Sequence, residues 1–220
     1  TKGRITPDEF IPLAEESGLI IDISNWVFNE VCANIKQWKA QNRQELQVSI
    51  NTSPSHYFNL ESNITQWLNL LLDQKISARS ILLEVTENLL MEANEMVSKK
   101  LFQFRQAGVD IALDDFGTGY CSLSYVAQYP IDVIKIDRCF IDVNQKTSRA
   151  IVGAITTIAH GLGLEVVAEG IETLDQIALV RERGCNVVQG FYFYQAMSLA
   201  ELHPVLPQVH HELERKLALN

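Results

Sequence analysis

Six apolar stretches of this sequence end in side chains that can bind hard metal ions or act on a phosphate. The polar residues at or just after these ends are Asn51, Glu84, Glu87, Asp114, Asp115, Lys135, Asp137, Glu169, Glu172 and Gln189. Carboxylates that are packed together repel and raise each other's pKa unless cations lie among them. Mg2+ and Mn2+ prefer oxygen ligands, and two such ions about 4 Å apart can clamp both oxygens of a phosphoryl displacement. We therefore expect a site for Mg2+ or Mn2+, with two ions.

Each of these acids also has a simpler interpretation. A single carboxylate after a strand is more often a helix N-cap or a solvated loop end than a catalytic group. The recurrence of polar residues at the ends of six successive stretches favours one shared site.

The six stretches are predicted β-strands separated by helices. They run from Leu46 to Asn51, Ile81 to Thr86, Val109 to Asp114, Ile131 to Asp137, Leu164 to Glu169 and Asn186 to Gln189. Strands that are apolar on both faces and alternate with helices indicate a parallel sheet with helices outside it. No glycine-rich dinucleotide loop or P-loop follows any strand, which argues against the open nucleotide-binding sheets. In a barrel the carboxyl ends of the strands meet at one mouth, so we predict an α/β fold of the TIM-like (βα) barrel type.

Helix boundaries are also marked in the sequence. Capping boxes are predicted at Thr6 to Glu9, Thr173 to Gln176 and Ser198 to Glu201, the first with proline at the first helical position. Glycines follow helical stretches where a left-handed C-cap would turn the chain back: Gly108, Gly161 or Gly163, and Gly184.

Two local patterns refine the predicted site. The segment DDFGTGYCSLSY, 114–125, places two glycines directly after the adjacent acids, where they would allow a tight loop and close approach to a ligand. An ordinary βα turn is the alternative. Lys135 and Asp137 share one face of their strand by period-two alternation, which favours a site role, and a buried structural ion pair is the alternative for Lys135.

Composition narrows the class of protein. The 220 residues are 47% hydrophobic and 20% charged, which is typical of one globular domain. The four cysteines form no metal-binding or disulfide pattern, and no apolar run has the roughly 18 residues of a membrane span. A net charge of −9 argues against binding DNA or RNA polymers. We expect a cytoplasmic domain, whether or not a longer parent protein is anchored in a membrane.

The ordered motifs resemble those of the EAL-domain cyclic di-GMP phosphodiesterases, a family of bacterial second-messenger signalling. The matching segments are VSINTSPSHY (48–57), LEVTEN (83–88), DDFGTGYCSLSY, IKIDRCF (134–140), VVAEGIET (166–173) and VVQGFYF (187–193), together with RITPDEFIPLAEESGLI at the start. The one visible change in a central motif is Cys121, where the family commonly has serine.

The resemblance implies a role for each site residue. Asn51, Glu84 and Asp114 would bind metal, and Asp114 would bridge to a second ion that Asp115 also holds. Lys135 would contact the catalytic water, Asp137 would orient that lysine, and Glu169 would act in or beside the ligands of the second metal. Glu87, Glu172 and Gln189 would position the loop, the metal waters or the substrate.

The resemblance also predicts missing parts. In the family, the Glu-Ala-Leu tripeptide, an arginine for the substrate phosphate and two strands lie upstream of the first helix. We therefore interpret residues 1–220 as a single EAL domain that is truncated at its N-terminus, with six of the barrel strands, and we expect this segment alone to be a poor catalyst.

Three functions are weighed. The first is hydrolysis of cyclic di-GMP to linear pGpG by a metal-activated water. The second is a catalytically inactive cyclic di-GMP receptor or protein-interaction module, and the third is an enolase-like barrel in which a lysine removes a carbon-bound proton. The motifs favour the first, with a homodimer and fusion to upstream sensory or diguanylate-cyclase-like domains implied by the resemblance.

Overall fold

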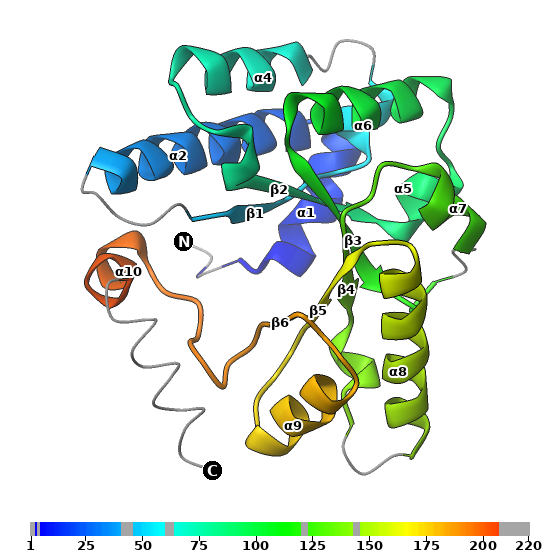
Figure 1. The fold of residues 1–220 in the computed structure, drawn as a ribbon. Coiled ribbons are helices and arrows are strands. Elements are labelled where there is room, and N and C mark those ends of the chain that lie inside the picture. The colour runs from blue at the N-terminus through cyan, green and yellow to red at the C-terminus, as the bar shows by residue number, and fades with distance from the viewer. Residues whose placement is uncertain are drawn as a thin grey trace. The chain divides into compact units, whose positions relative to one another are not determined.

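The computed structural model describes residues 3, 5–40, 46–59, 64–119, 123–142 and 146–206. It divides into two compact units (Figure 1). Unit 1 comprises residues 1–135 and 161–164, and unit 2 comprises residues 136–160 and 165–220. Strands and helices alternate along the chain in both units, as the sequence predicts.

Unit 1 contains the first four strands in the order β1-β2-β3-β4. Its elements are α1 (Pro7–Ser17), α2 (Ile20–Ala40), β1 (Val48–Asn51), α3 (Ser55–Phe58), α4 (Ile64–Asp73), η1 (Ala78–Ser80), β2 (Ile81–Thr86), α5 (Glu87–Met91), α6 (Glu95–Ala107), β3 (Asp110–Phe116), α7 (Leu123–Gln128) and β4 (Val133–Ile136), whose last residue belongs to unit 2. β1 and β2 run parallel with Asn51 opposite Glu84, and β2 and β3 run parallel with Thr86 opposite Asp114. The polar strand ends are therefore brought to one edge of this sheet.

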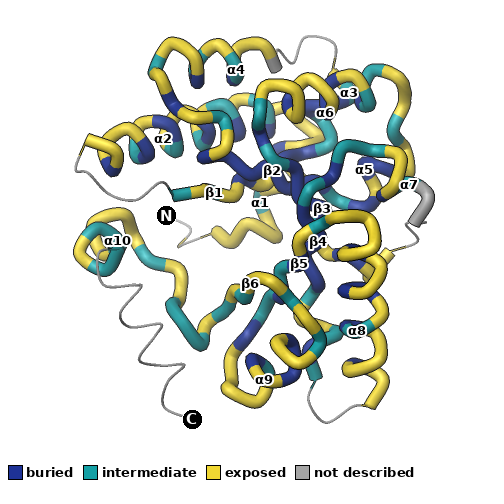
Figure 2. Tube along the Cα trace, viewed as in Figure 1, coloured by how far each residue is buried: buried dark blue, intermediate teal, exposed yellow. Residues whose placement is uncertain are grey.

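The core of unit 1 is formed by strands that are buried on both faces. Every residue of β2 from Ile81 to Val85 is buried, as the dark tube in Figure 2 shows. Helices cover the sheet with aromatic side chains: Trp67 of α4 stacks on Phe28 of α2, with ring centroids 4.3 Å apart, and its indole N–H donates to Asn25 at 2.8 Å. A strand that is buried on both faces reads as a continuous apolar run, which is why β2 was predictable.

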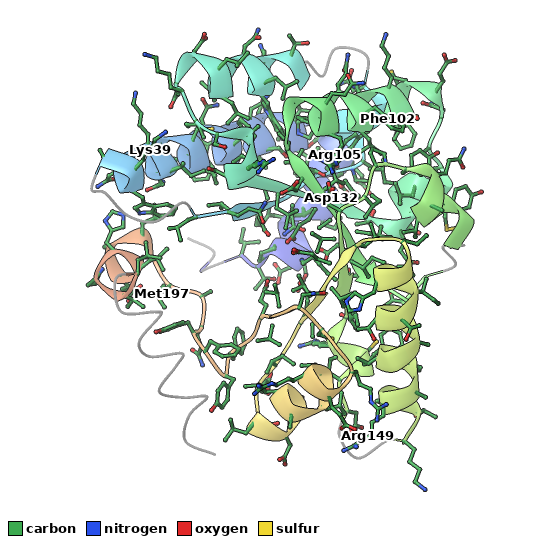
Figure 3. The ribbon with its side chains drawn as sticks, in the orientation of Figure 1. Lys39, Phe102, Arg105, Asp132, Arg149 and Met197 are labelled. Carbon is green, nitrogen blue, oxygen red and sulfur yellow. The ribbon has the colours of Figure 1, made fainter. Side chains whose placement is uncertain are left out.

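Asp132 fixes the chain where it enters β4. Its backbone N–H donates to Ile111 O at 2.9 Å, and its carboxylate accepts from Ile111 N at 3.0 Å. The Arg105 guanidinium lies 2.9 Å from the other carboxylate oxygen, and both residues are labelled in Figure 3. This cluster holds the amino end of β4 against β3.

Unit 2 contains the last residue of β4, followed by β5 and β6. Its elements are η2 (Arg138–Phe140), α8 (Lys146–Gly161), whose last residue belongs to unit 1, β5 (Glu165–Ala168), α9 (Leu174–Glu182), β6 (Val187–Val188) and α10 (Leu199–Val205). β5 and β6 are parallel, with Ala168 opposite Val188. α8 buries one face of regularly spaced residues that includes Val152, Ile155 and Ala159.

Most of the predicted helix boundaries are confirmed, and one is wrong. The capping boxes at Thr173 and Ser198 are present, and Gly108 and Gly184 have the positive φ of left-handed caps. Thr6 is the N-cap of α1, but its side chain makes no capping bond. Its carbonyl accepts the N–H groups of Glu9 and Phe10 at 3.1 and 3.3 Å, so the tightened first turn already satisfies the donor that a capping box would use.

The helices within the described residues include none that is long and apolar enough to cross a membrane. Cys121 of the DDFGTGYCSLSY segment lies outside the described residues, so the expectation for this position stays a prediction.

Candidate active site

Lys135 of β4 lies between two carboxylates from the two preceding strands. Its Nζ is 2.8 Å from Glu84 Oε1 of β2 and 2.8 Å from Asp114 Oδ1 of β3. The side chains of Lys135 and Glu84 are only 5% and 4% exposed, and that of Asp114 is 15% exposed. Charges this well removed from water persist only when they are paired, so the three groups form one electrostatic unit. Unit 1 thus brings these three predicted residues into contact.

Asn51 and Asp115 extend this group on either side. Asn51 ends β1 and stands opposite Glu84 in the parallel register, and its side chain is exposed. Asp115 is also exposed and has a φ of 52°, a left-handed conformation that residues other than glycine rarely adopt. The N–H and hydroxyl of Thr118 donate to the Asp115 carbonyl at 3.2 and 2.8 Å, which stabilises the turn. A regular strand would direct two adjacent acids to opposite faces, but here carboxylate oxygens of Asp114 and Asp115 lie within 4.8 Å of each other.

Glu87 fixes the glycine-rich loop after β3. Its buried carboxylate accepts a hydrogen bond from Gly117 N at 2.7 Å. Gly117 has a φ of 98°, and a Cβ at Gly119 would collide with Oε2 of Glu87. Both glycines are therefore required by the loop: one for its backbone angle and the other for the space that Glu87 occupies.

Unit 2 holds the remaining predicted residues. Glu169 follows β5, and its N–H donates to Ile136 O at 3.1 Å. In the same unit, the Gln189 N–H donates to Ala168 O at 2.9 Å, and the Gln189 carbonyl accepts from Ile171 N at 3.0 Å. Glu172 is exposed, and its N–H donates to Gln176 at 2.7 Å. These residues follow the strand ends of unit 2, as predicted, and their roles stay predictions.

Asp137 has a local partner that the sequence did not suggest. Its side chain caps η2 by accepting from Cys139 N at 2.9 Å. Burial disfavours its ionised form, but the hydrogen bonds from Cys139 and Arg138 and the nearby Arg138 charge outweigh this and hold the pKa of Asp137 below its usual value. Orientation of Lys135 by Asp137 stays a prediction.

The donor set in unit 1 fits a divalent cation. Asn51, Glu84, Asp114 and Asp115 offer only oxygen atoms, and a positive charge already lies between two of them in the form of the Lys135 ammonium. Hard divalent cations are the ions that prefer such an all-oxygen set of ligands. These four residues could hold the metal from unit 1 alone.

Sequence reasoning missed Thr52, which follows Asn51. Its backbone N–H and its hydroxyl both donate to the Glu84 carbonyl, at 3.0 and 2.7 Å. The signal available in the sequence was its position next to a predicted ligand. The bond itself depends on the pairing of β1 with β2.

Comparison with known proteins identifies the family. The EAL domain family model matches residues 1–196. The chain belongs to the EAL domain family. This EAL domain is 36% identical over 208 residues to the cyclic di-GMP phosphodiesterase NbdA of Pseudomonas aeruginosa, a match that covers 94% of this chain and 26% of NbdA. The chain spans about a quarter of the length of the curated relatives NbdA and DosP.

Solved structures confirm the predicted fold class of this EAL domain. The PaMucR phosphodiesterase of Pseudomonas aeruginosa in complex with c-di-GMP matches with a TM-score of 0.85 and 36% identity, over 92% of this chain and 82% of that protein. BlrP1 of Klebsiella pneumoniae in its manganese/cy-diGMP complex matches with a TM-score of 0.67 and 30% identity, over 78% of this chain and 44% of that protein.

Proposed function

We propose that this EAL domain hydrolyses cyclic di-GMP to linear pGpG with the help of two divalent ions, Mg2+ or Mn2+. The observation that carries the proposal is the buried placement of Lys135 between Glu84 and Asp114 at the carboxyl ends of three successive strands. The relatives named as cyclic di-GMP phosphodiesterases support the same reaction. Water attacks phosphorus in line, the bond to the 3′ oxygen breaks, and this oxygen leaves with a proton.

Asn51, Glu84, Asp114 and Asp115 hold the ions in this proposal. When bound, the ions supply positive charge that activates water and stabilises the negative charge developing on the phosphate. The chain positions its ligands by strand register on one side, Asn51 opposite Glu84, and by the left-handed turn at Asp115 on the other. A rigid sheet edge suits this task because a displacement of about 1 Å can cost about 100-fold in rate.

Lys135 orients the attacking water in this proposal. Its ammonium group is a compact positive charge, and its N–H bonds are of the kind that can donate to a water molecule. The contacts with Glu84 and Asp114 leave Nζ at the place where the ligands of the metal meet. Asp137 and Glu169 assist the lysine and the second ion, and Glu87, Glu172 and Gln189 position the loop, the metal waters and the substrate.

A cyclic di-GMP receptor without catalysis is the second candidate. It is favoured by the Lys135 ammonium, which already neutralises part of the charge of Glu84 and Asp114 without a metal.

Further proposals concern the whole protein: a homodimer, and fusion to sensory or cyclase domains. The proposed fusion is supported by relatives such as the bifunctional MucR of Pseudomonas aeruginosa, of which this chain covers 29%.

The test is a chromatographic assay for pGpG formed from cyclic di-GMP by a full-length version of the protein in Mn2+, in Mg2+ and in EDTA. Glu84→Ala or Asp114→Ala should abolish metal-dependent hydrolysis and leave the fold largely intact. The loss of activity should exceed the roughly 10 to 100-fold that is typical when a residue contacting a metal ligand is replaced. The matched control is Asp110→Asn, because Asp110 lies at the opposite end of β3 and bonds to Gln47 at 2.7 Å. Hydrolysis that survives in Asp114→Ala would contradict the assignment, and binding without any hydrolysis would support the receptor.

A further inference from the structure

Thr52 makes a bond that ordinary strand pairing does not require. Its backbone N–H donates to the Glu84 carbonyl at 3.0 Å, which already satisfies this oxygen. The Thr52 hydroxyl donates to the same oxygen at 2.7 Å. Two donors of Thr52, the residue after Asn51 on β1, thus converge on one carbonyl, that of Glu84 on β2. The hydroxyl therefore restrains the Glu84–Val85 peptide, on the strand beside the predicted ligand Asn51.

Tyr57 of α3 supports the Thr52 hydroxyl. The two oxygens are 3.1 Å apart, and Tyr57 is only 1% exposed. Since the Thr52 hydrogen points to the Glu84 carbonyl, the Tyr57 hydroxyl acts as the donor to Thr52. Burial raises the pKa of Tyr57, against the opposing effect of its bond to Thr52, so the phenol keeps its proton. The two hydrogen bonds form a chain: the Tyr57 hydroxyl donates to Thr52, and the Thr52 hydroxyl donates to the Glu84 carbonyl.

α3 itself is anchored from two sides, so the position of Tyr57 is fixed. The buried Lys100 ammonium of α6 donates to the carbonyls of His56 and Asn59 at 2.8 and 2.7 Å. Ser53 donates to Glu15 of α1 at 2.7 Å. The loop that carries Thr52 is therefore held by two helices as well as by β2.

We propose that Thr52, supported by Tyr57, is a positioning residue for the metal site, because it fixes the backbone of Glu84 beside Asn51. This inference rests on the proposed function, in which Asn51 and Glu84 bind metal. A partner that orients a ligand typically contributes about 10 to 100-fold to metal affinity. Thr52 acts on the backbone of the ligand, so we place its effect at the lower end, about 10-fold.

The test measures Mn2+ affinity by titration of the full chain and follows thermal unfolding in parallel. Thr52→Val keeps the shape and removes the hydroxyl, so Mn2+ affinity should fall about 10-fold. Thr52→Ser keeps the hydroxyl and should restore the wild-type affinity. Tyr57→Phe should give a partial loss, and it carries the test if Thr52→Val does not fold.

Thr156→Val is the matched control. Thr156 of α8 is also buried, and its hydroxyl donates to the Arg183 carbonyl at 2.7 Å, remote from any predicted ligand in the sequence. This variant should lose thermal stability and keep its Mn2+ affinity. The inference would be overturned if Thr52→Val lost thermal stability but kept its Mn2+ affinity. It would also be overturned if Thr52→Ser bound Mn2+ as weakly as Thr52→Val. A wild-type chain that binds no Mn2+ would overturn the proposed function together with the inference, and the two failures are thus distinguishable.

Discussion

At the scale of single residues, Lys135 dominates the electrostatics of the site. Its ammonium group is buried with Glu84 and Asp114, so removal of the lysine would leave two carboxylates without their shared counter-charge. Breaking such a buried pair typically costs about 3 to 5 kcal/mol of stability. A structural ion pair and a catalytic lysine would both suffer this cost, so stability alone does not separate the two interpretations of Lys135.

Kinetics separate these interpretations. In Lys135→Ala of a full-length version, assayed below its melting temperature in saturating Mn2+, we expect turnover of cyclic di-GMP to fall far more than affinity for the dinucleotide, because the proposed contact is with the attacking water. Lys146→Ala, an exposed lysine of α8, is the control and should match the wild type. A Lys135→Ala variant that loses dinucleotide affinity and keeps its turnover would exclude the proposed role.

Gly119→Ala tests the loop after β3. The added Cβ would collide with the Glu87 carboxylate and displace it from Gly117 N, so we expect lower hydrolytic activity and faster proteolysis within the loop. The control is Gly161→Ala at the end of α8, where a Cβ meets no atom within 4 Å. Wild-type activity and protease resistance in Gly119→Ala would show that the contact with Glu87 does not hold the loop.

At the scale of elements, a buried histidine of α3 lies beside a buried lysine of α6. His56 packs against Trp67, with ring centroids 5.0 Å apart, and its carbonyl accepts from Lys100. Burial and then the Lys100 charge lower the pKa of His56 from 6.5 to about 4. The unfolded chain therefore binds a proton between these two pH values and the folded chain does not, so stability is lost as the pH falls.

The expected pH dependence follows from this difference. Between pH 7 and pH 5, His56 should reduce the free energy of unfolding by about 2 kcal/mol, measured by urea denaturation. His56→Gln should remove this part of the pH dependence, whereas His160→Gln, at an exposed histidine of α8, should retain it. An equal pH dependence in the wild type and His56→Gln would mean that His56 is not kept neutral by the fold.

The elements that were predictable are those in which local pattern and burial agree. β2 was predicted with its observed bounds because it is apolar on both faces, and Glu84 stands out in it as a charge. β6 is only Val187–Val188, shorter than predicted, because Asn186 uses its side chain to accept from Val166 N and the chain turns at Gly190, which packs against the Ile171 backbone. The Thr52, Tyr57 and Glu84 contacts could not be predicted because they join residues of separate elements.

At the scale of the whole molecule, net charge opposes the proposed substrate. The chain carries a formal charge of −9, and cyclic di-GMP has a negative charge on each phosphodiester. Binding therefore needs local cations, which Lys135 supplies only in part because it already contacts Glu84 and Asp114. The ordered motifs made the family predictable, and the chain spans about a quarter of the length of the relatives DosP and NbdA.

Divalent ions should therefore control dinucleotide binding. We expect cyclic di-GMP to bind more weakly in EDTA than in Mn2+, as measured by calorimetry at constant ionic strength, because the site would be left with excess negative charge. Glu84→Ala, at a binding temperature where it is folded, should lose most of this metal dependence, and Asp110→Asn should retain it. Equal wild-type affinity in EDTA and Mn2+ would favour a receptor that binds without metal.

The central claim is that Glu84 and Asp114, with their neighbours Asn51 and Asp115, bind divalent metal, and a Mn2+ titration followed by electron paramagnetic resonance tests it most directly. Wild-type chain and Asp110→Asn should both remove Mn2+ from the free signal in a saturable manner, whereas Asp114→Asn should bind it much more weakly while remaining folded. Saturable binding of equal affinity in Asp114→Asn and Asp110→Asn would contradict the account, because the metal would then lie elsewhere.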